Sequence, residues 1–137
     1  MYFTQARDPH RGGAIGMATS TDGLTWTRRD EPVLTADSDS WELTTLDRPR
    51  VARTDDGYAM LYAGRNLTDR GLATSPDGVT WTRVGDAPAI TKADFPVPGD
   101  AWDAALVHRG GVLTYYLEIG FATSTGTEIY RATTPAP

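Results

Sequence analysis

The chain has 137 residues, of which 39% are hydrophobic and 23% charged, and its formal net charge is −5 at pH 7. This composition indicates one folded domain and excludes disorder, while the acidic balance argues against a nucleic-acid partner. There is no cysteine, so disulfides and thiolate metal sites are excluded.

The N-terminus, MYFTQARDPH, has no basic segment followed by an apolar one, so we expect no signal peptide in this chain. No apolar run approaches the roughly 20 residues of a membrane-spanning helix, so we expect no membrane partner. Bacterial cytoplasmic and secreted locations both stay open.

Short β-strands follow one another along the chain. No window shows a sustained helical stripe of apolar residues, whereas Thr, Val, Tyr and Trp gather between Asp-Gly and Gly-Gly turn signals. This pattern predicts an antiparallel meander. The expected strands are 1–6, 14–20, 24–29, 49–54, 58–64, 70–75, 79–84, 105–109, 112–118, 120–124 and 128–133.

One phrase occurs twice, as GMATSTDGLTWTRR from Gly16 and as GLATSPDGVTWTRV from Gly71. The copies agree at 10 of the 13 positions between Gly16 and Arg28. A third, weaker copy, GFATSTGTEIYR, starts at Gly120 and has Tyr130 at the tryptophan position. The step from Asp47 to Asp103 is close to the step from Gly16 to Gly71, so these aspartates follow the same period.

A unit of about four antiparallel strands repeating every 50 residues or so is typical of a β-propeller. We expect an all-β fold with about two and a half blades in a single partial propeller domain over 1–137. The approximate blade units are 1–40, 41–97 and 98–137.

The phrases IGMATSTDGLTWTRR, RGLATSPDGVTWTRV and DRPRVARTDDGYAMLYAG resemble blades of the five-bladed propeller glycosidases. The likeness is to glycoside hydrolase families 43, 32 and 68 and to the related family 130 of glycoside phosphorylases. It implies a partial five-bladed propeller, because five such units need roughly 250 to 300 residues. A second copy or further blades would then close the ring.

Alternating hairpins sort the loops of a blade onto two faces. The repeated turns with Asp22 and Asp77 fall on one face, where we expect a structural role. Asp47, Asp103 and Glu118 fall on the other face, around the mouth of the channel. A glycosidase needs a pair of carboxylates roughly 5 to 10 Å apart, and in the resembled families acidic residues at this blade position act as base, acid or pKa-tuning group. Asp47, Asp103 and Glu118 are therefore the catalytic candidates, and turn capping is the alternative for each.

Four residues near these carboxylates are candidates for substrate binding. Trp41 and Trp102 precede the two aspartates and would either stack on sugar rings or wedge between blades. Arg48 and Arg65, like Arg50 and Arg70, would bind sugar hydroxyls or balance the aspartates.

Two histidines without a ligand spacing do not make a zinc site, and no Gly-rich phosphate loop precedes a helix. We expect no metal and no cofactor; a calcium ion in the channel is the open alternative. The predicted function is hydrolysis of glycosidic bonds in a carbohydrate substrate by channel-mouth carboxylates. A noncatalytic module binding sugar or protein and an inactive fragment are the alternatives.

Overall fold

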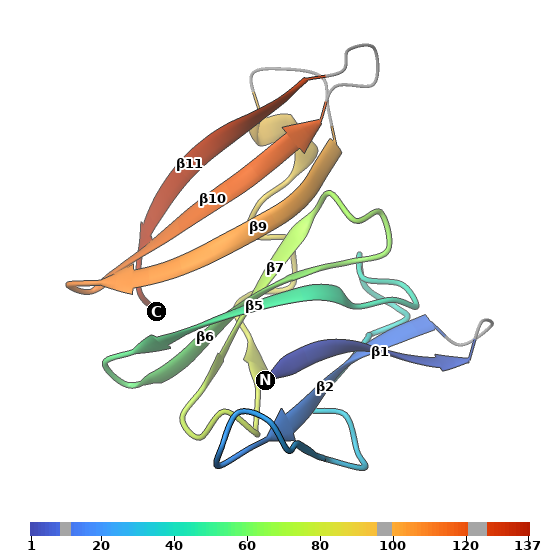
Figure 1. The fold of residues 1–137 in the computed structure, drawn as a ribbon. Helices are drawn as coiled ribbons and strands as arrows, with labels where there is room; N and C mark the ends of the chain where they lie inside the picture. The colour runs from blue at the N-terminus through green and yellow to red at the C-terminus, as the bar shows by residue number, and fades with distance from the viewer. Residues whose placement is uncertain (9–11, 96–99, 121–125) are drawn as a thin grey trace.

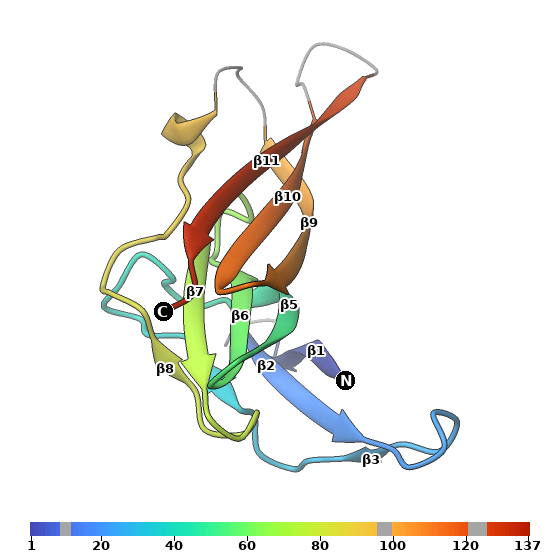
Figure 2. The same ribbon diagram turned by 90° about the vertical axis from the view of Figure 1, so that its left-hand side faces the viewer.

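Three antiparallel sheets make up the computed structural model, which describes residues 1–8, 12–95, 100–120 and 126–137. The sheets follow one another along the chain and lie side by side, with β9–β11 at one end and β1–β3 at the other (Figures 1 and 2). The described residues contain no α-helix, and none of their helical segments is long and apolar enough to cross a membrane. The all-β prediction is confirmed.

The first sheet has the strand order β1-β2-β3, with β4 also pairing with β2; the second has the order β5-β6-β7-β8, and the third β11-β10-β9. The strands are β1 (Tyr2–Asp8), β2 (Gly12–Thr19), β3 (Thr27–Arg28), β4 (Leu34–Thr35), β5 (Asp47–Thr54), β6 (Gly57–Ala63), β7 (Arg70–Ser75), β8 (Thr82–Arg83), β9 (Asp100–Arg109), β10 (Val112–Gly120) and β11 (Thr127–Pro135), with a short 3₁₀ helix η1 at Lys92–Asp94.

Two hydrophobic cores join the three sheets. Ile15 and Leu34 of the first sheet pack with Met60 and Trp81 of the second. A further core holds Leu61 and Leu72 of the second sheet against Leu113, Tyr115, Leu117 and Ile119 of the third. The second sheet therefore packs one face on the first sheet and its other face on the third, as consecutive propeller blades do.

The third copy of the repeat folds differently from the prediction. Gly120, expected to begin a third strand, ends β10, and residues 121–124 of that expected strand lie outside the described residues. The segment 128–133, expected as a fourth strand, belongs to β11, which pairs with β10 as the third strand of its sheet. The alternating sequence of β10 extends this strand as far as Gly120, which corresponds to Gly16 and Gly71 at the start of the other two copies.

The two close copies of the repeat form the same turn. Asp22 Oδ1 accepts the amides of Leu24 and Thr25, both at 2.8 Å, and these hydrogen bonds lower the pKa of Asp22 to about 2. Asp77 repeats this pattern in the second copy, where backbone hydrogen bonds also lower its pKa to about 2. The turn takes up most of the expected strands 24–29 and 79–84, which is why β3 and β8 have only two residues each. The predicted structural role of these aspartates is confirmed.

Candidate functional site

The two predicted aspartates lie at corresponding positions of neighbouring strands: Asp47 is the first residue of β5 and Asp103 the fourth of β9, and each pairs with the seventh residue of the strand that follows. The pairing of β5 with β6 shifts register between Asp47 and Arg50, and the pairing of β9 with β10 skips Trp102, just before Asp103. Asp47 Oδ1 accepts the amide of the next residue at 2.7 Å, and Asp103 Oδ1 does the same. Each aspartate thus lies at a β-bulge, a feature that re-aims side chains and is frequent beside active sites.

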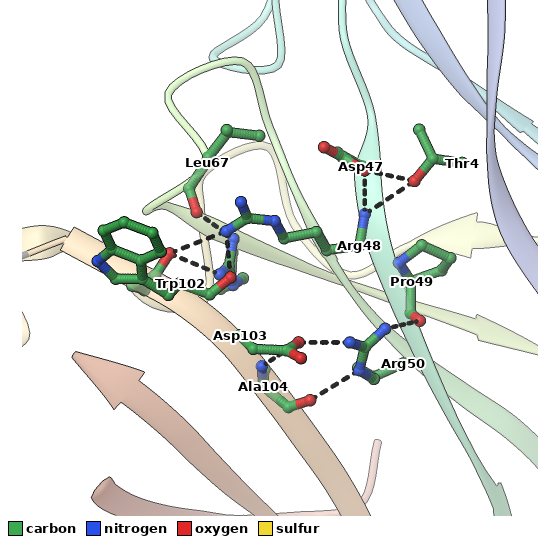
Figure 3. Close-up of polar contacts among 11 residues, drawn as sticks. Thr4, Asp47, Arg48, Pro49, Arg50, Leu67, Trp102, Asp103 and Ala104 are labelled. Carbon is green, nitrogen blue, oxygen red and sulfur yellow. Dashed lines mark hydrogen bonds and ion pairs between the residues drawn. The ribbon is translucent and has the colours of Figure 1, made fainter. Parts of the chain in front are cut away.

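Asp47 is held by the first sheet as well as by its own strand. The hydroxyl of Thr4 in β1 donates a short hydrogen bond to Asp47 Oδ1, and the same hydroxyl accepts the amide of Arg48 at 3.2 Å (Figure 3). Thr4 was not among the predicted site residues. Oδ1 is thus fixed by two donors, and Oδ2 has no hydrogen-bond partner within the described segments.

Asp103 is held by the second sheet. Arg50 Nη2 forms a short ion pair with Asp103 Oδ1, and Arg50 Nε donates to the carbonyl of Ala104 at 2.7 Å (Figure 3). The side chains of Arg50 and Asp103 are 38% and 54% exposed, so this ion pair contributes little stability, on the order of 0–1 kcal/mol. Its role is to fix one carboxylate oxygen, as Thr4 does for Asp47.

Three arginines of the second sheet donate to carbonyls of the edge strand β9. Arg48 Nη1 contacts the carbonyl oxygens of Ala101, at 3.3 Å, and Trp102, while Arg70 Nη2 donates to Ala101 at 3.1 Å. Arg50 is the third, through Ala104. These donors satisfy backbone groups at an edge that no strand of the described chain covers.

Arg70 lies beneath this cluster with only 1% of its surface exposed. Burial, together with the nearby positive charge of Arg48, lowers the pKa of Arg70 to about 10. Its Nε has no hydrogen-bond partner in the described part of the chain. Arg70 therefore supports the site from below and does not face solvent.

A hollow of about 280 Å³ opens beside the bulge of β9. It is lined by Arg48, by Trp102 and Asp100 of β9, and by the β6–β7 loop. Trp102 is 60% exposed, so its indole is free to contact a ligand, and Lys92 Nζ pairs with Asp100 at 2.8 Å. The structure thus places two of the predicted substrate-binding residues, Arg48 and Trp102, in the lining of one hollow.

Glu118 lies directly opposite Asp103 in the β9–β10 pairing. Residues opposite each other in an antiparallel pair project from the same face, and both line a second hollow of about 200 Å³ with Tyr116 and Ile129. The predicted acid is therefore close to one predicted aspartate, and it belongs to the third sheet together with Asp103.

Trp41 and Arg65 lie away from this cluster. Trp41 stacks on Tyr62, with ring centroids 5.9 Å apart and planes inclined by 21°, and it packs against the core between the first two sheets. This position favours the wedge role over sugar stacking. Arg65 is exposed and makes no hydrogen bond or ion pair with any residue that the structure describes.

Glu42 is a buried carboxylate that sequence reasoning missed. It is fully buried and accepts hydrogen bonds from the Tyr62 hydroxyl at 2.6 Å, from Arg83 Nε and Nη2, both at 2.7 Å, and from the Asp37 amide at 2.9 Å. A single glutamate in the polar stretch SWELTT carries no signal of burial. Its four donors make it a structural link between the 36–46 connection and the second sheet.

The described residues contain no group of three or more acidic or histidine side chains that would hold a metal ion. His108, on β9, is almost buried, and its Nε2 lies 3.9 Å from the exposed carboxylate of Asp55. The calcium alternative gains no support from this arrangement.

Comparison with known proteins adds the family. The model of a family described as beta-1,4-mannooligosaccharide phosphorylase, glycoside hydrolase family 130, matches residues 1–111. A 1,2-beta-oligomannan phosphorylase of Thermoanaerobacter sp. is 35% identical over an alignment of 92 residues, and the match covers 60% of this chain and 30% of that protein. An uncharacterised protein of Mycobacterium tuberculosis is 30% identical over 121 residues, covering 82% of this chain and 37% of the relative.

Solved structures agree with this likeness. A structure named "Glycoside hydrolase" matches 96% of this chain and 40% of its own with a TM-score of 0.67, and at 22% identity it shows the fold alone. Another, at 26% identity and a TM-score of 0.57, matches 88% of this chain and 40% of its own. It is described as "The GH130 family of mannoside phosphorylases contains glycoside hydrolases that target beta-1,2 mannosidic linkages in Candida mannan". The chain spans about a third of the length of the curated relatives it matches.

Proposed function

Because the chain belongs to glycoside hydrolase family 130, we propose that it contributes part of an active site that cleaves β-mannosidic bonds in oligosaccharides. The family and its relatives support a carbohydrate-active, glycoside-processing role. The proposal also covers the linkage that is cleaved and the molecule, phosphate or water, that accepts the sugar. A relation to families 43, 32 and 68 stays a prediction from the sequence.

The observation that carries the proposal is the pair of aspartates, Asp47 and Asp103, each of which lies beside a β-bulge. Asp47 is the first residue of β5 and Asp103 the fourth of β9, and each has Oδ1 fixed by the amide of the next residue and by one side chain of a neighbouring sheet. Hydrolysis of a glycosidic bond needs two carboxylates, and phosphorolysis needs one of them as the acid. Glu118, opposite Asp103, is the third candidate.

The proposed chemistry needs one proton donor and one nucleophile. A protonated carboxyl of this group transfers its proton to the glycosidic oxygen, which leaves with the bonding electron pair as the C1–O bond breaks. If inorganic phosphate attacks C1, the products are a sugar 1-phosphate and a shortened oligosaccharide. If water attacks, a second carboxylate accepts its proton and a free sugar forms.

The family description and one relative, both named as phosphorylases, favour phosphate as the acceptor, and the family 130 hydrolases named in a solved structure keep hydrolysis as the second candidate. The hollow beside Trp102 and Arg48 is the proposed sugar contact. An exposed indole offers an apolar face to a sugar ring, and the remaining guanidinium N–H groups of Arg48 suit hydroxyl oxygens.

The test incubates the chain with β-1,2- and β-1,4-linked mannooligosaccharides, with and without inorganic phosphate, and separates the products. We expect cleavage that depends on phosphate and that falls at least about 100-fold in at least one of the variants Asp47→Asn and Asp103→Asn, the one that removes the proton donor. Asp55→Asn, an exposed aspartate in the β5–β6 turn, is the matched control and should keep full activity. Cleavage without phosphate supports the hydrolase candidate.

Binding of the oligosaccharides to the chain without turnover, weakened by Trp102→Ala, would identify a noncatalytic sugar-binding module and overturn the catalytic proposal. Activity that survives both aspartate substitutions would also overturn it. Thermal melting of every variant establishes that the fold is retained.

A further inference from the structure

The two copies of the repeated turn have the same local structure and different surroundings. Trp81 is 9% exposed and belongs to the core, whereas Trp26 is 43% exposed. A Cβ placed at Gly78 would meet the Tyr2 hydroxyl at 2.7 Å, whereas one placed at Gly23 would meet nothing within 4 Å. The first copy therefore lacks the cover that the second copy has.

The cover of the second copy is Tyr2, from the first sheet. Its hydroxyl donates to the carbonyl of Gly78 at 2.6 Å, and its ring meets Trp81 edge to face, with centroids 5.6 Å apart and planes inclined by 87°. Such an aromatic pair with a satisfied hydroxyl is a favourable contact beyond its buried area. The equivalent contact at the first copy would place a tyrosine against Trp26.

Strand register identifies the residue of the third sheet that corresponds to Tyr2. Tyr2 pairs with Met17, and Leu61 pairs with Leu72, the residue at the same position of the repeat. Leu61 is therefore the Tyr2 position of the second sheet, and it faces the third sheet in the core.

Leu61 is the fifth residue of its strand after a two-residue turn, counted from Gly57, the partner of Thr54. Tyr116 is the fifth residue of its strand after the equivalent turn, counted from Val112, the partner of Arg109. The third sheet thus carries a tyrosine at the Tyr2 position. Tyr116 is 40% exposed, so this tyrosine covers no turn within the described chain.

Tyr116 lies in an apolar face that nothing in the described chain covers. We name it the third-sheet face; its exposed apolar residues are Val107, Val112, Tyr116 and Ile129. The opposite end of the molecule has the first-sheet face, formed by Phe3, Leu24 and Trp26, with Leu24 86% exposed. Phe3 belongs to it because successive strand residues alternate, and Tyr2 faces the second sheet.

We propose that the third-sheet face of one copy of the chain docks on the first-sheet face of a second copy, head to tail. In this contact Tyr116 takes the place that Tyr2 occupies in the chain, with its hydroxyl donating to the Gly23 carbonyl and its ring against Trp26. The contact repeats the one between the first and second sheets. Both halves of it lie on the same polypeptide, which is why a second copy is the fitting occupant.

A contact of this kind uses different patches on the two partners, so it closes into a ring or continues as a chain of molecules. The test is the mass of the wild-type chain in solution by light scattering after size-exclusion chromatography, over a range of concentrations. The single chain has a mass of 14.8 kDa, and we expect at least twice this mass, falling on dilution as the copies dissociate. A mass equal to that of the single chain at every concentration overturns the proposal.

Two single substitutions test the geometry. Tyr116→Arg and Trp26→Glu should each weaken association by at least about 30-fold, because central aromatic residues dominate interface affinity. An equal mixture of the two variants should associate again, since the intact Tyr116 of one variant meets the intact Trp26 of the other. Failure of the mixture to recover would exclude the head-to-tail arrangement.

Leu43→Arg is the control for a new charge at an exposed leucine outside both faces, because Leu43 is 41% exposed in the connection before β5. It should leave association unchanged. Tyr116→Phe keeps the ring and loses the donor to Gly23, so it should weaken association by only about fivefold. Equal association of wild type and Tyr116→Arg would show that another surface joins the copies and would overturn the proposal.

Discussion

Replacing Glu42 by glutamine should strongly destabilise the fold, although the two side chains have nearly the same shape. The Glu42 carboxylate accepts from four donors, and two of them come from Arg83. Glutamine keeps one acceptor oxygen and replaces the other by an NH₂ group. That group faces two donors, so one charge-assisted bond to Arg83 is lost and a second donor has no acceptor.

The expected loss is about 3 kcal/mol of unfolding free energy. Breaking a buried ion pair from one side costs about 3–5 kcal/mol, and the lower end applies because the Arg83 side chain is 33% exposed and regains some hydration. For a chain of this size, about 3 kcal/mol corresponds to a fall of roughly 10 °C in melting temperature.

Urea denaturation monitored by tryptophan fluorescence measures this loss. Glu128→Gln is the matched control, because Glu128 also accepts a tyrosine hydroxyl, that of Tyr130 at 2.7 Å, but at an exposed position. The control should change stability by less than about 0.5 kcal/mol. If Glu42→Gln lost less than about 1 kcal/mol, the inferred weight of the Arg83 link would be wrong.

Two further predictions concern the acid stability of the Glu42 site and the glycines of the two repeated turns. Burial alone would raise the pKa of Glu42, but hydrogen bonds from Arg83 and its other donors hold that pKa below its usual value. The contribution of the Glu42 carboxylate to the free energy of unfolding is therefore present above the pKa of the unfolded state, about 4.3, and is lost as pH falls through the lower pKa of the folded state. The free energy of unfolding should fall more steeply from about pH 5 to about pH 3 in wild type than in Glu42→Gln. It is measured by urea denaturation at each pH, and the same dependence on pH in both proteins would contradict this. Gly23→Ala and Gly78→Ala both place a Cβ at a φ near +75° and should each cost about 1 kcal/mol. Gly78→Ala should cost about 1 kcal/mol more because Tyr2 lies in its way; this comparison is made in the Tyr116→Arg background, which keeps the copies apart, and equal losses would refute the steric argument.

The repeated phrase carried most of the predictable fold. The alternation of apolar and polar residues, together with the turn residues, located nearly every strand. It did so because each strand of a sheet that packs on a neighbouring sheet shows this alternation in its own sequence. The aspartate pair was also predictable, because the period that relates the Asp22 and Asp77 turns relates Asp47 and Asp103 too. The prediction for the third copy failed because Gly120 has nearly the same local sequence as Gly16 but is the last residue of β10, whereas Gly16 lies inside β2, so local sequence did not decide the element.

Local sequence did not predict which of these residues are buried. Trp26 and Trp81 have almost identical neighbours in sequence, yet only Trp81 meets a tyrosine from another sheet. Glu42 and Thr4 likewise acquire their roles from residues more than 40 positions away, Arg83 and Asp47. For Trp41 the sequence left sugar stacking and a wedge between blades both open, and the fold stacks its ring on Tyr62.

The arginines that reach from the second sheet to the carbonyls of β9 have a consequence for protein engineering. Arg48, Arg50 and Arg70 belong to one repeat unit, but the groups they satisfy belong to the next. A unit cut out at the repeat boundary would keep the arginine donors and lose the β9 carbonyls that accept from them. The part to transfer in protein design is therefore the interface between consecutive units, and blade shuffling should keep the arginines together with the bulged strand to which they donate.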